Sequence, residues 1–275
     1  MERDAQDVTF LKDHRIRAII EGIAHTKGIG PSLHRLPLTD DIFERMVTLI
    51  DSRGPISVEY SLILAAMAAG IYGLMRGGEF LQTTGYQREE SLLNLNQVQF
   101  WYPNPAHTIG HQSSEKPLAS IPISSFITRC SGDNPGPYPV AMSLTLKCSK
   151  NDAHKRGTEA LIGDPSGIKL ICNYLLQAHP AVNNQDSGLF LHPNGTRLTS
   201  AQLVPKMREL LVMINIPNPE AYMLHSLRKG GAQSLRDAGT SEEHIRQAGR
   251  WNTRSAAALY SQQSIQQAIN ISRRK

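Results

Sequence analysis

YMLHSLRKGGAQSLRDAGTSEEHIRQAGRWNTRSAAALYSQ, residues 222–262, holds four side chains whose order and spacing decide how this sequence is interpreted. His225 and Arg228 are three positions apart, so they share one face if the segment is helical. Tyr260 follows Arg228 by 32 positions and Trp251 by nine. Taken singly, each of these side chains is more typical of a helix cap or a packing role. Only the joint pattern indicates a site.

Two segments earlier in the chain extend this pattern. The apolar segment 57–73 predicts a buried helix, and the sequence GLMRGGEFL at its end places Arg76 and Glu79 three positions apart. The segment VAMSLTLKCSKNDAHKRGTEALIG, residues 140–163, predicts a β-hairpin. Its turn lies near residues 151–157, with Lys150 beside it.

Helical periodicity dominates the rest of the chain from residue 38 onward. Thr39 and the two acidic residues after it favour a helix N-terminus. Further helices are expected over residues 168–177, 200–213 and 224–238. Thr240 and Glu243 predict a capping box for one more helix, which ends near Gly249.

The strand signals are fewer and predict a small antiparallel sheet. Apolar and β-favouring residues over 93–102 add strands to the hairpin. Residues 103–139, rich in Pro, Ser, Gly and His, predict a long inserted loop. The expected fold is therefore α+β and mainly α. Residues 1–37 predict one helix left from an upstream domain and a linker, and residues 38–275 form the main domain.

The composition, with 40% hydrophobic and 19% charged residues among 275, is that of an ordinary globular protein and excludes disordered, collagen-like and coiled-coil classes. Three cysteines without a C-x-x-C pair argue against a disulfide framework or a thiolate zinc site and fit a reducing compartment. The longest apolar stretch, residues 61–75, falls short of the roughly 18–20 residues that a membrane span needs. The first ten residues show no secretory signal. An intracellular protein without a membrane partner is expected.

The net charge of +5 is unevenly distributed. Residues 205–275 hold 11 Lys and Arg against 5 Asp and Glu, hence +6, so residues 1–204 carry −1. A basic region of this kind favours an anionic partner.

These motifs together resemble the tyrosine recombinase (phage integrase) family over about residues 38–262. In that family a buried helix ends in an arginine with a glutamate three positions later, and a lysine lies in a β-hairpin. An H-x-x-R motif then precedes a His or Trp and a nucleophilic tyrosine. The matching residues are Arg76, Glu79, Lys150, His225, Arg228, Trp251 and Tyr260. The dipeptide Arg250-Trp251 and the sequences SKND and HSLRKGGA look most like recombinases of eukaryotic mobile elements of the Crypton and DIRS type.

The resemblance implies a DNA breaking and rejoining enzyme, with a tyrosine recombinase catalytic domain at residues 38–275 and the remnant of a core-binding domain at 1–37. Two guanidiniums suit the extra negative charge that a phosphodiester gains in its five-coordinate transition state. Tyr260 would hold the phosphorus as a 3′-phosphotyrosyl ester. His225 would take the phenol proton or donate to a phosphate oxygen, and Lys150 would protonate the leaving 5′ oxygen. Neither a metal ion nor ATP is expected, because the arginines supply the charge and the ester retains the bond energy.

Several assignments have rivals. The residues expected to bind DNA phosphates are Lys147, Lys155, Arg156, Lys229 and Arg254, of which the first three also compete with Lys150 as the general acid. A type IB topoisomerase has the same residue set, and residues 240–260 alone fit a helix-turn-helix in a DNA-binding remnant without activity. Double-stranded DNA is the expected partner and a homotetramer on DNA the expected assembly. The expected location is the nucleus of a eukaryote or the cytoplasm of a bacterium.

Overall fold

The computed structural model describes residues 35–82, 92–103, 118–130, 137–147 and 157–251. The chain separates into two units, Met1–Arg35 and Leu36–Lys275. Every helix and strand described below belongs to the second unit.

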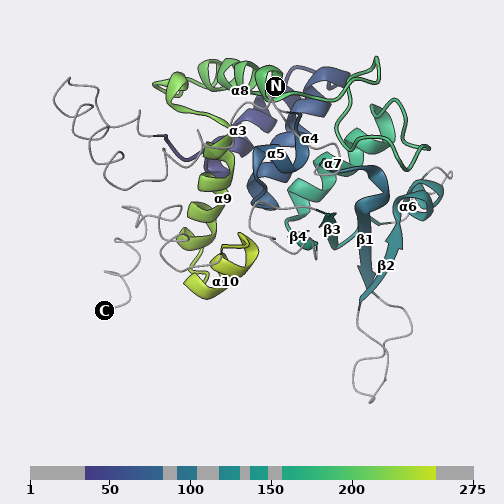
Figure 1. The fold of residues 1–275 in the computed structure, drawn as a ribbon. Coiled ribbons are helices and arrows are strands. Elements are labelled where there is room, and N and C mark those ends of the chain that lie inside the picture. Colours follow the sequence, from purple (N-terminus) through teal and green to yellow (C-terminus); the bar gives the residue numbers. More distant parts are fainter. Residues whose placement is uncertain (1–34, 83–91, 104–117, 131–136, 148–156, 252–275) are drawn as a thin grey trace, which may run out of the picture. The chain divides into compact units, whose positions relative to one another are not determined.

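Helix α4, Val58–Tyr72, is the centre of the helical part (Figure 1). Its residues from Leu62 to Ile71 are buried on all sides, as the apolar composition of this segment predicts. The side chain of Ser57 accepts a hydrogen bond from the backbone N–H of Tyr60 and so caps the helix. Two further helices pack on α4, namely α7, Pro165–Gln177, and α9, Leu224–Asp237. The predicted helix over residues 57–73 is confirmed.

Two adjacent glycines let α9 approach its neighbours closely. A Cβ atom on Gly230 would lie 1.6 Å from the carbonyl oxygen of Leu38, and one on Gly231 would lie 2.1 Å from that of Ile71. Both separations are far below van der Waals contact, so only glycine fits at either position. This close packing holds the first turns of α9, which carry Arg228, against the C-terminal end of α4.

The sheet has four antiparallel strands in the order β2-β1-β3-β4. Their bounds are Val98–Pro103 for β1, Leu118–Pro122 for β2, Ala141–Leu146 for β3 and Thr158–Ile162 for β4. Strands β3 and β4 pair in register from Met142↔Ile162 to Leu146↔Thr158, which confirms the predicted hairpin. The turn between them, residues 148–156, lies outside the described residues.

The expectation of one long loop over residues 103–139 is wrong for residues 118–130. These residues form the edge strand β2 and the helix α6, Ile123–Cys130. Phe126 of α6 is fully buried and stacks on Phe100 of β1, with ring centroids 4.0 Å apart. Part of the segment therefore belongs to the core, and we expect its deletion to destabilise the fold.

The remaining helices surround this core. They are α3, Asp40–Asp51; α5, Gly77–Phe80; α8, Ser200–Met213; α10, Glu242–Ala248; and the 3₁₀ turns η2, Leu95–Gln97, and η3, Pro219–Ala221. The predicted helix over residues 200–213 is confirmed with the same bounds, whereas Leu95 lies in η2 and not in a strand.

The predicted cap of α10 is displaced by one residue. Ser241, not Thr240, accepts a hydrogen bond from the backbone N–H of His244. Thr240 is already engaged in the end of α9, where its backbone N–H donates to the carbonyl of Leu235 across Gly239. Gly239 has a φ of 84°, which is typical of a glycine that ends a helix.

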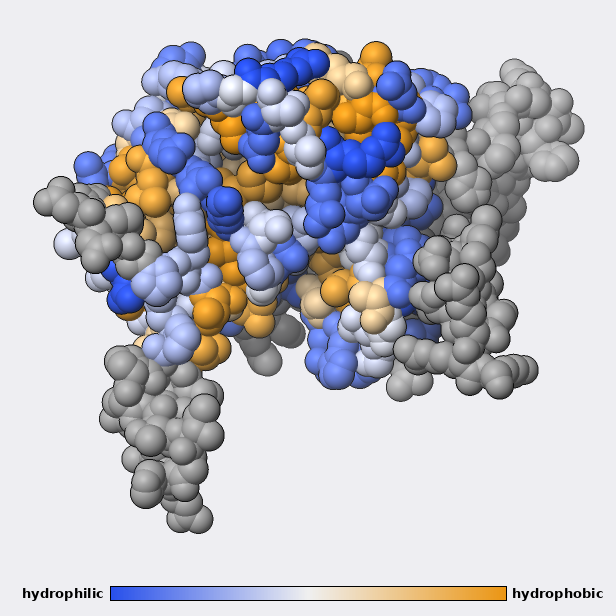
Figure 2. Space-filling view, turned by 180° about the vertical axis from the view of Figure 1, so that it is seen from behind, coloured by the Kyte–Doolittle hydropathy of each residue, from blue (hydrophilic) through white to orange (hydrophobic). Residues whose placement is uncertain are grey.

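Among the described residues, no helix is both long and apolar enough to cross a membrane. Figure 2 shows hydrophobic side chains interrupted by hydrophilic ones on the face turned away from the view of Figure 1. Scattered apolar residues of this kind are usual on a protein surface.

His179, in the segment after α7, is a buried histidine with two backbone partners. Its Nε2 lies 2.9 Å from the carbonyl oxygen of Gly188, and its Nδ1 accepts from the backbone N–H of Ala181 at 3.2 Å. Both contacts are satisfied by a neutral ring that carries its proton on Nε2. Burial lowers the pKa of His179 below its usual value.

We therefore expect the free energy of unfolding to be highest above about pH 6.5, the usual pKa of histidine, and to fall as the pH drops through the lower pKa of the folded protein. Protons then bind the unfolded chain more tightly than the folded one. Urea unfolding at pH 7.5 and pH 5 measures this loss, and the variant His179→Asn should show a smaller difference between the two pH values. An equal difference in both proteins would assign the pH dependence to other groups.

Candidate active site

The C-terminal ends of α4 and α10 meet at the candidate site, where arginine side chains join them. Each helix ends in a residue with positive φ that is not glycine, Leu74 after α4 with 44° and Arg250 after α10 with 55°. At the end of α10, the backbone N–H of Trp251 donates to Arg246 at 3.0 Å and that of Arg250 to Gln247 at 2.9 Å. This hydrogen-bond pattern is a Schellman turn, which satisfies the carbonyls of Arg246 and Gln247, while the carbonyl of Gly249 accepts from Arg228.

Trp251 folds back over this turn. A Cβ atom on Gly249 would lie 1.7 Å from the indole ring, so the glycine makes room for the ring. The buried indole packs with Leu74 and Ile245 in a small apolar cluster. The guanidinium carbon of Arg228 lies 4.5 Å from the centre of the ring, a cation–π contact.

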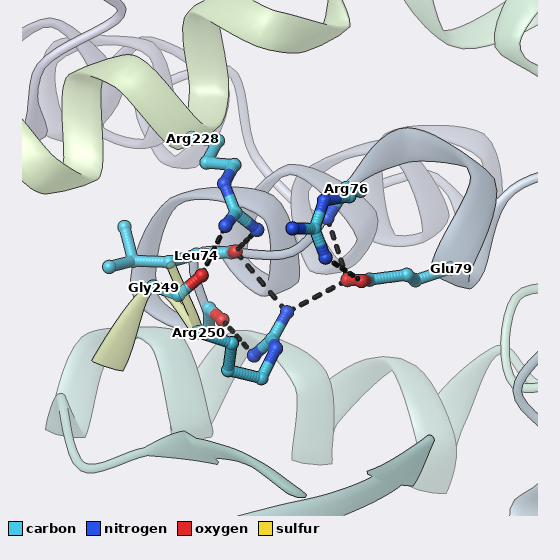
Figure 3. Close-up of polar contacts among 7 residues, drawn as sticks. Leu74, Arg76, Glu79, Arg228, Gly249 and Arg250 are labelled. Carbon is cyan, nitrogen blue, oxygen red and sulfur yellow. Dashed lines mark hydrogen bonds and ion pairs between the residues drawn. The ribbon is translucent and has the colours of Figure 1, made fainter. Parts of the chain in front are cut away.

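Arg228 connects the two helix ends. Its side chain is 1% exposed, and its two terminal nitrogens donate to the carbonyl oxygens of Leu74 and Gly249 (Figure 3). Carbonyls at helix C-termini carry partial negative charge and attract a cation. Arg228 thereby holds α4, α9 and α10 together.

Arg76 and Glu79 lie beside this junction. Arg76 precedes α5, and its Nη1 lies 2.9 Å from Oε1 of Glu79, while its backbone N–H donates to Oε2 at 2.8 Å. Glu79 is buried, whereas the Arg76 side chain is 23% exposed. A ligand can therefore reach the guanidinium of Arg76, whereas the carboxylate of Glu79 is buried.

Arg250 is the third guanidinium at the site. Its Nη2 lies 2.8 Å from Oε2 of Glu79, and its terminal nitrogens also donate to the carbonyls of Gly73 at 3.3 Å and Leu74 at 3.4 Å. Burial lowers the pKa of Arg250, Glu79 raises it, and the positive charge of Arg76 lowers it. Arg250 therefore interacts with both Glu79 and Arg76.

The contacts of Figure 3 therefore set three guanidiniums against one carboxylate. The sequence motifs predicted only Arg76 and Arg228 as arginines of the site, whereas Arg250 figured only in the resemblance to mobile-element recombinases. The sequence holds no local signal for Arg250, because the left-handed position after α10, where glycine is usual, is known only from the structure.

The other predicted site residues divide into three groups. Glu79 and Trp251 join the cluster of Figure 3. His225 is exposed in the first turn of α9, Lys229 is half-buried further along α9, and Lys147 is exposed directly after β3. Five predicted site residues lie outside the described residues, namely Lys150, Lys155, Arg156, Arg254 and Tyr260.

Arg228 has a structural contact set in addition to its expected role. It was expected as one of two guanidiniums that suit the charge of a phosphodiester, and both of its terminal nitrogens donate to protein carbonyls in this structure. Among the described residues, no group of three His, Cys, Asp or Glu side chains is arranged to hold a metal ion.

Comparison with known proteins identifies the fold. No protein-family model and no curated protein sequence matches this chain. Among solved structures, XerA recombinase aligns with a TM-score of 0.54 at 13% identity, over 89% of this chain and 65% of that one. XerH site-specific recombinase, in a post-cleavage complex with its palindromic difH substrate, aligns with a TM-score of 0.53 at 14% identity, over 87% of this chain and 54% of that one.

The chain thus spans less than two thirds of the length of either recombinase. The likeness establishes the fold, which is that of a tyrosine recombinase catalytic domain, mainly helical with a small four-stranded antiparallel sheet. The predicted fold class is confirmed.

Proposed function

We propose that this protein is a site-specific DNA recombinase or integrase that breaks and rejoins DNA through a 3′-phosphotyrosyl intermediate on Tyr260. The observation that carries the proposal is the arginine cluster on a recombinase catalytic fold: Arg76 and Arg250 both bind Glu79, and Arg228 shares the carbonyl of Leu74 with Arg250. An excess of fixed guanidinium charge is suited to a phosphodiester. XerH, which shares the fold, was solved with its DNA substrate.

In the proposed reaction, the phenol oxygen of Tyr260 attacks the phosphorus and the bond to the 5′ oxygen breaks. The phenol proton passes to His225, and Lys150 gives a proton to the departing 5′ oxygen. Arg76, the most exposed guanidinium of the cluster, neutralises the charge that develops on the non-bridging oxygens. Arg228 supplies further positive charge while it holds the turns at Leu74 and Gly249 in place. Attack by the 5′-hydroxyl of a second strand reverses these steps and releases Tyr260.

The finer features of the proposal follow the sequence resemblance. The motifs are closest to recombinases of mobile elements of the Crypton and DIRS type, and strand exchange between two duplexes calls for a tetramer on DNA. The protein would act where DNA is held, in the nucleus of a eukaryote or the cytoplasm of a bacterium. Residues 1–37 would be the remnant of a core-binding domain and residues 38–275 the catalytic domain.

A pool of random-sequence duplexes, each with a nick beside a potential cleavage position, tests the chemistry. Loss of the short 5′-hydroxyl fragment should trap the protein on DNA as a complex that resists denaturing gel electrophoresis, with EDTA present and ATP absent. Tyr260→Phe should abolish this complex, because the covalent bond is to the phenol oxygen.

Tyr138→Phe is the matched control. Tyr138 is an exposed tyrosine bonded to Asn173, and its replacement should leave the yield unchanged. If the Tyr260→Phe variant still forms the covalent complex, the nucleophile is a residue other than Tyr260. DNA binding without any covalent complex would make the protein a binding module, and relaxation of supercoiled DNA without strand exchange would make it a topoisomerase.

The basic residues outside the reacting set should give DNA affinity its salt dependence. Charge reversal by Lys229→Glu or Arg254→Glu should weaken binding to all sequences and lower the slope of log affinity against log salt by about 1 for each DNA phosphate that the variant no longer neutralises. Fluorescence anisotropy over a salt series measures both quantities. Lys169→Glu, the same charge change at an exposed residue of α7, should have less effect. Equal effects from all three variants would mean that net charge, not these positions, governs binding.

A further inference from the structure

Arg250 occupies a backbone position that disfavours it. A φ of 55° is the left-handed region, where a residue with a Cβ atom is strained and where glycine usually ends a helix. The Nε of Arg250 is also buried without a hydrogen-bond partner among the described residues. Both features lower the stability of the fold relative to glycine at this position. The contacts of the guanidinium are therefore expected to contribute something that glycine cannot.

Arg250 and Arg76 bind the same carboxylate, that of Glu79. Glu79 binds Arg76 through Oε1 and Arg250 through Oε2, at 2.9 and 2.8 Å. Without Arg250, Arg76 would face a buried carboxylate of equal and opposite charge, and the pair would be neutral overall. A neutral pair attracts an anion weakly, and the carboxylate itself repels a phosphate. With Arg250, the three groups carry a net charge of +1.

We propose that Arg250 is a positioning residue that holds and neutralises Glu79, so that Arg76 stays oriented and available to an oxyanion. The turn after α10 thereby completes an anion site at α5, through a contact between Glu79 and Arg250, which are 171 positions apart in the chain. This inference rests on the proposed function only in taking a DNA phosphodiester as the natural anion.

Inorganic sulfate is the probe for this site, because it is a doubly charged oxyanion and its binding does not depend on cleavage. At low millimolar concentration and constant ionic strength, sulfate should raise the melting temperature of the full chain in a saturable manner. Arg250→Gln should weaken sulfate binding about tenfold, since one nearby charge is removed.

The double variant Arg250→Gln with Glu79→Gln separates a charge role from a structural one. Removing the carboxylate restores the net charge of +1 around Arg76, so sulfate affinity should return to within a few-fold of the wild type. A purely structural role for Arg250 predicts that the double variant is no better than the single one. Arg250→Gly, which suits the left-handed backbone, repeats the comparison if the glutamine variant folds poorly.

Arg236→Gln is the matched control, because Arg236 has a similar exposure of 13% and pairs with Glu242 outside the cluster. This control should bind sulfate as the wild type does. Wild-type affinity in Arg250→Gln, no recovery in the double variant, or no saturable sulfate response in the wild type would each overturn the proposal. The covalent complex on Tyr260 is measured separately, so loss of the proposed function leaves the sulfate result interpretable.

Discussion

Replacing Arg228 with alanine should lower the free energy of unfolding by about 3–5 kcal/mol. The carbonyl of Gly249 would lose its charged donor, that of Leu74 would keep only the longer contact from Arg250 at 3.4 Å, and the indole of Trp251 would lose its cation–π partner. The three helices α4, α9 and α10 would then meet around weakly satisfied helix-end carbonyls and a cavity. Urea unfolding of the full chain measures the change.

Arg45→Ala is the appropriate control for this large effect. Arg45 also donates to a backbone carbonyl, that of Ile214 at 2.6 Å, but its side chain is exposed. Its removal should cost less than about 1 kcal/mol. Arg228→Lys should fall between the two, because an ammonium keeps the charge but cannot span both carbonyls as a planar fork does. Wild-type stability in Arg228→Ala would contradict the junction described here.

Replacing Arg76 with alanine should reduce the covalent-complex yield about 10²–10³-fold with little loss of stability. The side chain is partly exposed, and the backbone N–H of residue 76 can still donate to Glu79. Arg76→Lys should recover only part of the activity, because it keeps the charge and loses the fork. Undiminished cleavage by Arg76→Ala would exclude this residue from the phosphate site.

The parts of the fold that follow from local sequence were predictable. The helix at residues 200–213 and the hairpin of β3 and β4 arise from periodicity and turn residues within one short segment. Strand β2 was missed because almost all of its residues are exposed at the sheet edge, so LASIP lacks the alternation of a half-buried strand. The cap of α10 was misplaced by one residue because the C-terminal turn of α9 extends to Thr240, whose backbone N–H donates to the carbonyl of Leu235.

Most residues of the candidate site were predictable from the sequence, but their contacts were not. The motif that contains Arg76 and Glu79, and the motif that contains Arg228 and Trp251, are visible in the sequence, but the way they meet depends on tertiary packing. Arg228 donates to helix-end carbonyls because α9 lies close against α4, which Gly231 permits. Arg250 reaches Glu79 only because its backbone is left-handed, and a sequence does not display such a conformation at a residue other than glycine.

The most direct test of the central claim, that the arginine cluster acts on the charge of a DNA phosphate, compares two forms of one nicked duplex selected from the random pool. One carries the normal phosphate at the cleavage position, and the other carries a methylphosphonate, in which a neutral methyl group replaces a charged oxygen. The charge that Arg76 would neutralise is absent from the second form. We expect the cleavage defect of Arg76→Ala, measured against the wild type as covalent-complex yield, to shrink at least about tenfold on the methylphosphonate. An equal defect on both duplexes would contradict the claim.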